Sequence, residues 1–151
     1  MLFVTFHGGS DDGAASEPPP PPNPAAQQTK PHNNVNAYDE TDPGAGAIKD
    51  VLAAPAGIQL SELRGLLFAN GYLYVAVGSK HQNAILCYQP SATPSKGSYT
   101  FVSVLADQTC ASISHPFDLT LSGSGRCWAS SQDTNVVTEL TLSANGQNAT
   151  W

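Results

Sequence analysis

The sequence has few charges and no long apolar run. Charged residues are 12% of the 151 residues, against ~25% in an average soluble domain. The chain has 6 Lys and Arg against 12 Asp and Glu, a formal net charge of −6. Nucleic acids and anionic membranes bind basic patches, so this balance argues against both as partners. The longest apolar run is far short of the ~18 residues that a membrane-spanning helix needs.

Cysteine is scarce and catalytic motifs are absent. Cys87, Cys110 and Cys127 are an odd number and lie far apart, which indicates neither a CxxC metal site nor a disulfide framework. We expect them to be small buried hydrophobes. The sequence has no Gly-x-Ser-x-Gly, His-Glu-x-x-His or phosphate-loop pattern, and nothing in it identifies a cofactor. No signal peptide is visible from Met1, so a secreted or periplasmic location would require an export signal upstream.

A proline-rich segment interrupts the chain early. Residues 8–34 include five consecutive prolines, Pro18 to Pro22, and almost no apolar side chain larger than Ala. Such a stretch cannot bury enough surface to offset the entropy lost on ordering, so we expect a disordered insertion loop over 8–34. The proline run is expected to be an extended polyproline II spacer, with a ligand for a proline-binding domain as the alternative.

The rest of the chain consists of short alternating segments separated by turn residues. Asn70-Gly71 between two such segments is a strong β-hairpin signal, and no segment has convincing helical periodicity. The fold class predicted from this pattern is all-β. Strands are expected over residues 2–6, 35–38, 47–52, 63–68, 72–77, 84–88, 99–105, 117–121, 127–130 and 136–142.

The segments also repeat. One unit contains four short strands in about fifty residues, which is the period and content of a β-propeller blade built as a four-stranded antiparallel meander. We therefore expect a single incomplete propeller domain over 1–151. It would have about two and a half blades, beginning in the second strand of one and ending before the fourth strand of another. The matches at an offset of 53 residues are 51–53 with 104–106, 63–66 with 116–119 and 74–76 with 127–129; Asn34, Asn83 and Asn135 mark a third strand.

Two stretches resemble a known family. LRGLLFANGYLYVAVGSKHQNAILCY (63–88) and HPFDLTLSGSGRCWASSQDTNVVTEL (115–140) are similar to the NHL-type unit, and through it to gluconolactonase-like (SMP-30) and streptogramin-lyase-like propellers. Leu63 stands where the family usually has Pro, and Val77-Gly78 where it has Asp. Whole members of the family have about six blades. The resemblance therefore implies a truncated product, a fragment, or several copies assembling into one ring.

Antiparallel pairing predicts which polar residues share one end of the sheets. The turns between second and third strands, and the connections between units, lie at the same end. That end collects the candidate binding residues His7, His32, His81, His115 and Asp133. Histidines and carboxylates can hold metals or transfer protons, and ordinary polar loops are the alternative. No residue matches the metal-ligating Glu of the gluconolactonase-like enzymes.

Two functions from different classes follow. The first is a non-catalytic binding or scaffold module, with the remainder of a propeller or further copies of the chain as partners. The alternative is a fragment of a propeller enzyme of the lactonase or lyase type. Phe117, Trp128, Tyr72, Tyr74 and Tyr88 are expected to pack between units rather than to stack on a ligand. Asp118 is expected to have a structural role.

Overall fold

The computed structural model describes residues 2–5, 33–42, 44–79, 82–123 and 125–151. Every regular element in these ranges is a β-strand, so the all-β prediction is confirmed. The strands form three antiparallel sheets in which neighbours in sequence are neighbours in space. Sheet 1 contains β1 (Leu2–Thr5), β2 (Val35–Tyr38) and β3 (Ala47–Ile48). Sheet 2 contains β4 (Leu63–Ala69), β5 (Tyr72–Ser79), β6 (Gln82–Gln89) and β7 (Thr100–Asp107). Sheet 3 contains β8 (Pro116–Leu121), β9 (Arg126–Ser131), β10 (Val136–Leu142) and β11 (Ala149–Thr150).

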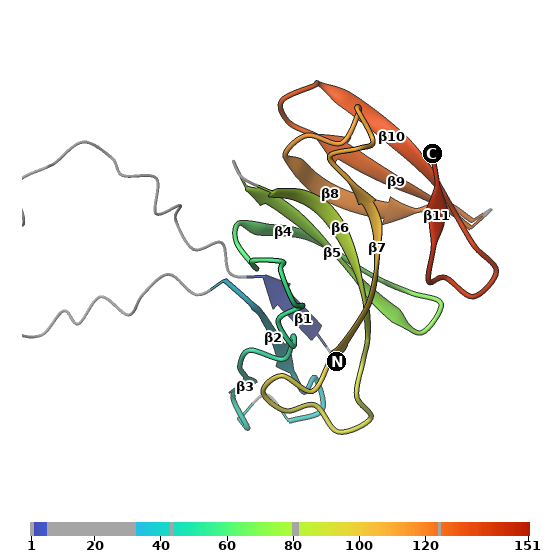
Figure 1. Cartoon of the computed structure of the whole chain (residues 1–151). Coiled ribbons are helices and arrows are strands. Elements are labelled where there is room, and N and C mark those ends of the chain that lie inside the picture. The colour runs from blue at the N-terminus through green and yellow to red at the C-terminus, as the bar shows by residue number, and fades with distance from the viewer. Residues whose placement is uncertain (1, 6–32, 43, 80–81, 124) are drawn as a thin grey trace, which may run out of the picture.

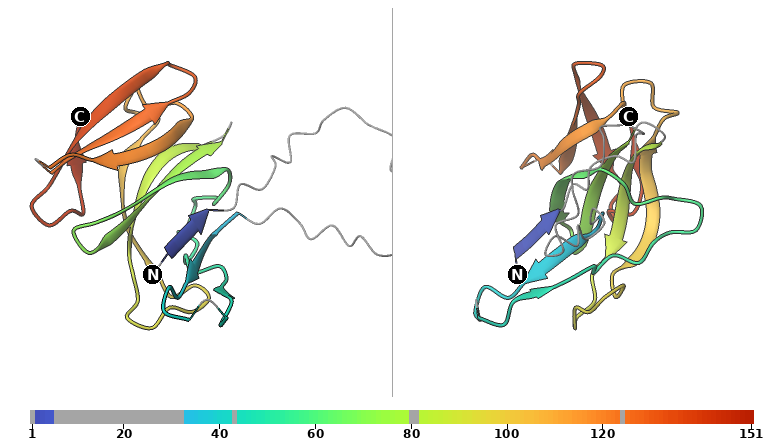
Figure 2. Two further views of the ribbon diagram at one scale, coloured as in Figure 1. Left: turned by 180° about the vertical axis from the view of Figure 1, so that it is seen from behind. Right: turned by 90° about the vertical axis from the view of Figure 1, so that its left-hand side faces the viewer.

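Sheet 2 lies between sheets 1 and 3, and its strand β4 packs against both β1 and β8 (Figures 1 and 2). Two apolar layers fill the spaces between them. Sheets 1 and 2 bury one cluster that includes Val35, Leu73 and Leu86, and sheets 2 and 3 bury another that includes Tyr74, Ile85 and Leu140. Alternation along each strand therefore supplies apolar residues to both faces of sheet 2, the central sheet.

Most predicted strands end within two residues of the observed ones, and three other boundaries were predicted wrongly. Residues 8–32 of the expected disordered segment lie outside the described residues, but Asn34 belongs to the fold, because its Oδ1 accepts the N–H of Leu52 at 3.0 Å. The strand expected over 47–52 is shorter, because Leu52 leaves sheet 1 and forms an isolated parallel bridge with Tyr99, the residue directly before β7. Sheet 3 was expected to stop before a fourth strand, yet Ala149 of β11 pairs with Leu142.

The predicted alignment of β5 with β9 is wrong by one residue. Leu63 of β4 pairs with Val77 of β5, and Pro116 of β8 pairs with Ser131 of β9. The first strands of sheets 2 and 3, β4 and β8, are here called the inner strands. They repeat after 53 residues, whereas the second strands, β5 and β9, repeat after 54. Cys127 therefore takes the place of Leu73 rather than of Tyr74, and it faces sheet 2 just as Leu73 faces sheet 1. A slip of one residue turns every side chain to the other face of a strand, so the buried pattern decides the register.

Sheets 2 and 3 approach each other very closely at their inner strands. A Cβ on Gly65 would lie 2.7 Å from the Cα of Asp118, and a Cβ on Gly78 would lie 2.8 Å from the carbonyl oxygen of Pro116. Both neighbours are backbone atoms and cannot rotate away. Glycine at these two positions is therefore what allows β8 to lie against β4 and β5.

We predict that Gly65→Ala destabilises the fold by about 1–3 kcal/mol, because the added methyl group must push β8 away from β4. Gly123→Ala is the matched control, since a Cβ there would meet nothing within 4 Å. Urea denaturation of both variants measures the effect. Equal stability of the two variants would show that the sheets are not packed this closely.

Candidate functional site

A cluster of ionisable side chains, here called the charged cluster, lies where the inner strands of sheets 2 and 3 begin. Glu62 directly precedes β4, His115 directly precedes β8, and Asp133 lies in the turn between β9 and β10. The imidazole of His115 stands between two carboxylates: Nε2 is 3.5 Å from Oε2 of Glu62, and Nδ1 is 3.4 Å from Oδ1 of Asp133. The cluster thus joins sheet 2 to sheet 3 through a single histidine.

Arg64 completes the cluster on the side of sheet 2. Its guanidinium lies 3.4 Å from Oε2 of Glu62 and 5.1 Å from the centre of the Phe117 ring. The Glu62 side chain is only 10% exposed and that of Arg64 18%, while Asp133 is 58% exposed. The cluster therefore runs from a nearly buried ion pair to a carboxylate in solvent. A cation over an aromatic face adds an attraction of ~0.5–1 kcal/mol at exposed sites.

Glu62 and His115 hold the same place in consecutive units. They are 53 residues apart, the offset of the inner strands, and both have left-handed backbone angles, with φ of 48° and 53°. Their backbone carbonyl groups also accept equivalent hydrogen bonds. The carbonyl of Glu62 accepts the N–H of Gly78, and the carbonyl of His115 accepts the N–H of Gln132. Non-glycine residues adopt this conformation only when the surroundings hold them there.

An asparagine from the preceding sheet holds each of these residues. Oδ1 of Asn33 accepts the N–H of Glu62 at 3.2 Å, and Oδ1 of Asn83 accepts the N–H of His115 at 2.6 Å. Asn33 is therefore the counterpart of Asn83, one residue before the Asn34 that the sequence repeat suggested. Both junctions between sheets are built on the same side chain to backbone hydrogen bond.

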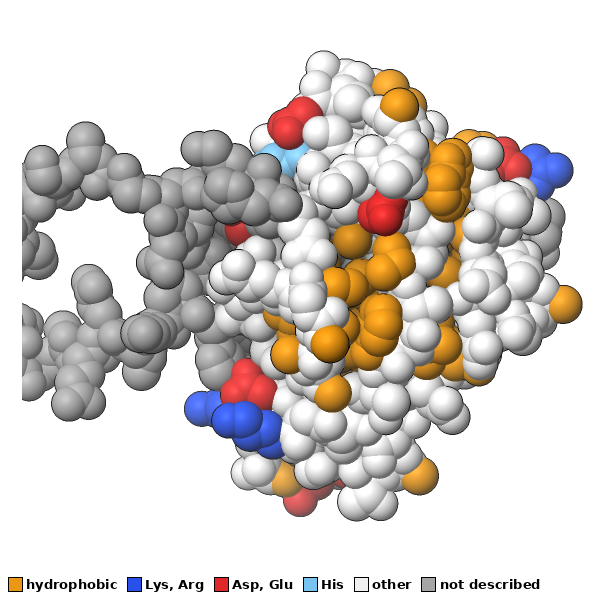
Figure 3. All heavy atoms as spheres, viewed as in Figure 1, with side chains coloured by type: hydrophobic (Ala, Val, Ile, Leu, Met, Phe, Trp, Pro, Cys, Tyr) orange, Lys and Arg blue, Asp and Glu red, His pale blue; other side chains and the backbone are white. Residues whose placement is uncertain are grey.

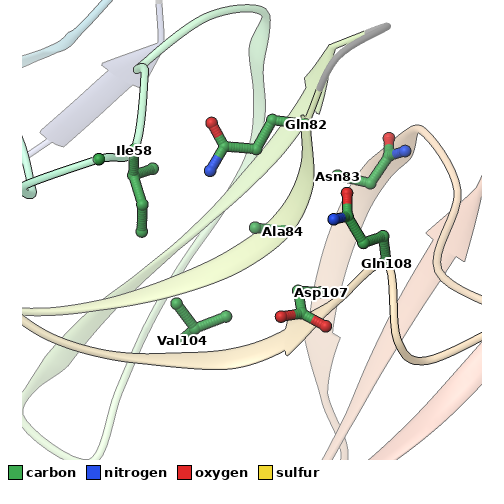
Figure 4. Close-up of a pocket in the computed structure, with 8 residues that line it drawn as sticks. Ile58, Gln82, Asn83, Ala84, Val104, Asp107 and Gln108 are labelled. Atoms are coloured by element: carbon green, nitrogen blue, oxygen red, sulfur yellow. The ribbon is translucent and has the colours of Figure 1, made fainter.

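A pocket of about 340 Å³ opens beside this cluster, at the same end of sheet 2. Figure 4 shows the amide side chains of Asn83 and Gln108 next to each other on one side of the pocket, with Ile58 across from them and Val104 below. Asn83 links the pocket to the charged cluster, since its oxygen binds the backbone of His115. The complete lining is Gly57, Ile58, Gln82, Asn83, Ala84, Val104, Asp107 and Gln108.

Most of the polar groups around the pocket also hold its walls. Oδ1 of Asp107 accepts hydrogen bonds from the N–H and the hydroxyl of Thr109, which lower the pKa of the Asp107 carboxyl. Oε1 of Gln82 accepts the N–H of Gln59 and so fixes the loop that carries Ile58. The walls are therefore set before any ligand arrives, which reduces the entropy lost on binding.

Of the five residues predicted for this end of the sheets, the structure brings His115 and Asp133 together. His7, His32 and His81 lie outside the described residues. Sequence reasoning missed Glu62 and Arg64, although a signal for Glu62 was present: it precedes His115 by the same 53 residues that relate the inner strands. It also missed the pocket, whose neutral amides have no characteristic spacing.

The aromatic and acidic residues singled out in the sequence divide into two groups. Tyr74 and Tyr88 are fully buried between sheets, as expected, and burial raises the pKa of both phenols. Phe117 is half exposed and lies under Arg64, so it belongs to the charged cluster rather than to the core. Asp118 is exposed, and its carboxylate accepts the N–H of Leu119.

The described donors do not fit the divalent metal of the gluconolactonase-like enzymes. Glu62 faces Arg64 and His115, and the oxygen of Asn83 is bonded to a backbone N–H, so these oxygens do not converge on one point. In the described part of the chain, no three His, Cys, Asp or Glu side chains form a group able to hold a metal ion. Nor do these residues include a helix long and apolar enough to cross a membrane.

All three cysteines are buried free thiols in the layer between sheets 2 and 3. Burial raises the pKa of Cys87 and of Cys127 to about 11, from an ordinary value of 9.0.

We predict that native protein reacts slowly with a thiol reagent at mildly alkaline pH and that guanidinium exposes fast-reacting thiols, because the thiolate is the nucleophile. The unfolded chain ionises these thiols near pH 9 and the folded chain near 11, so the free energy of unfolding should fall as pH rises above 9. Fast reaction of Cys87 or Cys127 in native protein would contradict the packing of this layer.

We also predict that Asn83→Ala lowers the free energy of unfolding by about 1–3 kcal/mol, because it leaves the N–H of His115 without an acceptor. Asn148→Ala is the control, since Asn148 is exposed and only its backbone is hydrogen-bonded. Chemical denaturation of both variants is the measurement. A neutral Asn83→Ala would mean that this hydrogen bond does not hold the junction.

The chain matches no protein-family model, no curated protein and no solved structure. Its function must therefore be inferred from its own residues and their contacts.

Proposed function

We propose that the chain is a non-catalytic binding or scaffold module built of β-propeller blades of the NHL type, and that it binds its ligand at the end where β4 and β8 begin. The observation that carries this proposal is the charged cluster of Glu62, Arg64, His115 and Asp133 beside a pre-shaped pocket. Arg64 is paired with Glu62, and the imidazole of His115 lies between Glu62 and Asp133, so these side chains stabilise the rim of the pocket rather than act on a substrate.

Repetition between units supports the propeller. Each junction has a buried apolar layer, an asparagine bonded to the backbone of the next unit, and a left-handed residue before the inner strand. The inner strands β4 and β8 also share a bulge near their first residues. Units that pack in the same way at successive junctions are the basis of a propeller.

The hydrogen bonds at the site favour binding over catalysis. The hydroxyl of Ser114 donates to Oδ2 of Asp133 at 3.4 Å, so this serine faces a carboxylate and not the imidazole of His115. An activated serine needs a general base within hydrogen-bond reach. Both nitrogens of His115 face carboxylates instead, which suits a structural bridge between sheets.

The pocket offers hydrogen-bonding groups to a neutral ligand. Oδ1 of Asn83 is used by His115, which turns the amide N–H groups of Asn83 to other partners, and Gln108 is exposed at the mouth. Ile58, across from these amides, and Ala84 and Val104 provide aliphatic surface. Amide donors above an aliphatic surface suit a neutral polar group, such as a peptide amide or a sugar hydroxyl.

The alternative is a propeller enzyme of the lactonase or lyase type. The position of His115 beside the pocket favours it, because Asn83 of the pocket binds the backbone of His115 and a histidine side chain can transfer protons. The two functions differ in what His115→Gln would do. It should abolish turnover of an enzyme but leave binding in the neighbouring pocket largely intact.

Peptide and glycan arrays test the proposal, with chromogenic lactones as the probe for turnover. We expect wild-type protein to bind members of one array, Gln108→Ala to weaken that binding, and no lactone to be hydrolysed above background. Thr93→Ala, in the exposed loop before β7, is the control variant. Lactone turnover that His115→Gln removes would overturn the proposal in favour of the enzyme, and binding unaffected by Gln108→Ala would place the ligand elsewhere.

A further inference from the structure

Asp107 brings a carboxylate to the pocket that the charged cluster does not use. Among the described residues that line the pocket, it alone has a charged side chain. Its Oδ1 accepts both the N–H of Thr109, at 2.8 Å, and the hydroxyl of Thr109, at 2.7 Å. In the described part of the chain, no group binds the second oxygen, Oδ2. The bonds from Thr109 lower the pKa of the carboxyl, so Asp107 is ionised at neutral pH and offers one charged oxygen to a ligand.

Aliphatic side chains lie across the pocket from this carboxylate. Figure 4 shows Asp107 on the side that also holds Asn83 and Gln108, with Ile58 on the opposite side. Val104 lines the pocket as well and is 37% exposed, so its methyl groups are open to contact. A ligand that fits both sides has an aliphatic stem and a cationic head that donates hydrogen bonds.

The hydrogen bonds of Asp107 distinguish between the two common cationic side chains. An arginine guanidinium binds a carboxylate best through two parallel bonds, one to each oxygen. Because Oδ1 of Asp107 already accepts two bonds from Thr109, only one oxygen remains for a ligand. A lysine ammonium is a compact charge with three donors, so it can bind that oxygen and a neighbouring amide oxygen together. Gln108, the next residue, has such an oxygen and also lines the pocket.

The size of the pocket and the charge of the chain favour the same ligand. The volume of about 340 Å³ is near the lower end of the ~300–1,000 Å³ of ligand pockets, which suits a single side chain better than an oligosaccharide. The chain has 12 Asp and Glu against 6 Lys and Arg, and this excess attracts cationic ligands. On the face that Figure 3 draws, the described basic side chains lie toward the margin, apart from the hydrophobic side chains at the centre.

We propose that the pocket binds the lysine side chain of a peptide, with the ammonium group between Oδ2 of Asp107 and the amide oxygen of Gln108. The aliphatic stem of the lysine lies against Ile58 and Val104. The N–H groups of Asn83, whose oxygen is held by the backbone of His115, then meet a carbonyl group of the same peptide. This inference rests on the proposed function and narrows its ligand from a peptide or a sugar to a peptide that contains lysine.

NMR titration of the isotope-labelled full chain with N-acetyl-lysine N-methylamide tests the proposal. We expect this probe to shift the side-chain amide signals of Asn83 and Gln108, with an affinity that falls as salt is added. Asp107→Asn should weaken binding by about tenfold or more, because asparagine keeps an oxygen for Thr109 but loses the charge. Asp39→Asn is the matched control. Oδ1 of Asp39 accepts the same two bonds from Thr41, but in an exposed turn outside the pocket.

Analogues of the probe test the chemistry of recognition. The Nε-acetylated form lacks the charge and the arginine form has a planar head, so both should bind more weakly than the lysine probe. The proposal would be overturned by equal binding of either analogue, by no binding of the lysine probe, or by binding that Asp107→Asn leaves unchanged.

A sugar probe separates this inference from the proposed function. If methyl glucoside binds and is weakened by Gln108→Ala but not by Asp107→Asn, the lysine pocket is wrong and the binding function stands. Ligand binding that Gln108→Ala leaves unaffected would remove the pocket itself, and with it both proposals.

Discussion

The hydrogen bond from the N–H of His115 to Oδ1 of Asn83 is the contact on which the junction of sheets 2 and 3 depends. It holds His115 at a φ of 53°, which starts β8 in the direction that lets it lie against β4. Gly65 and Gly78 then allow the backbones to meet without a side chain between them. The same contact places the imidazole between Glu62 and Asp133, so the fold and the candidate site have one origin.

Short apolar runs between turn residues predicted nearly all the strands, because a strand with a core on one face alternates between apolar and polar residues and a strand with a core on both faces is apolar throughout. The runs around Asn70-Gly71 match β4 and β5 closely. Register was harder to predict. The turn Asn70-Gly71 links β4 to β5, whereas residues 122–125 link β8 to β9, so the units do not repeat at one constant offset. A comparison of residue types alone does not locate this difference in turn length. The burial of Cys127 and Leu73 in two different apolar layers does locate it.

The candidate site was predictable in part. Strand order alone placed His115 and Asp133 at one end of the sheets, and the structure has them 3.4 Å apart. Glu62 and Arg64 escaped notice because Glu62 precedes a strand whose own residues are mostly apolar, and Arg64 reads as an exposed position within it. Their role follows from the close approach of β4 and β8, which depends on two glycines and on backbone angles that the sequence does not reveal.

Amide hydrogen exchange at His115 tests most directly whether the asparagine contact holds the sheets together. The account predicts that this amide, although it precedes a strand, exchanges as slowly as the amides of β8. It also predicts that Asn83→Ala speeds its exchange while the amide of Glu62, held by Asn33, remains protected. Exchange of the His115 amide at the rate of an open loop in the wild-type protein would contradict the account.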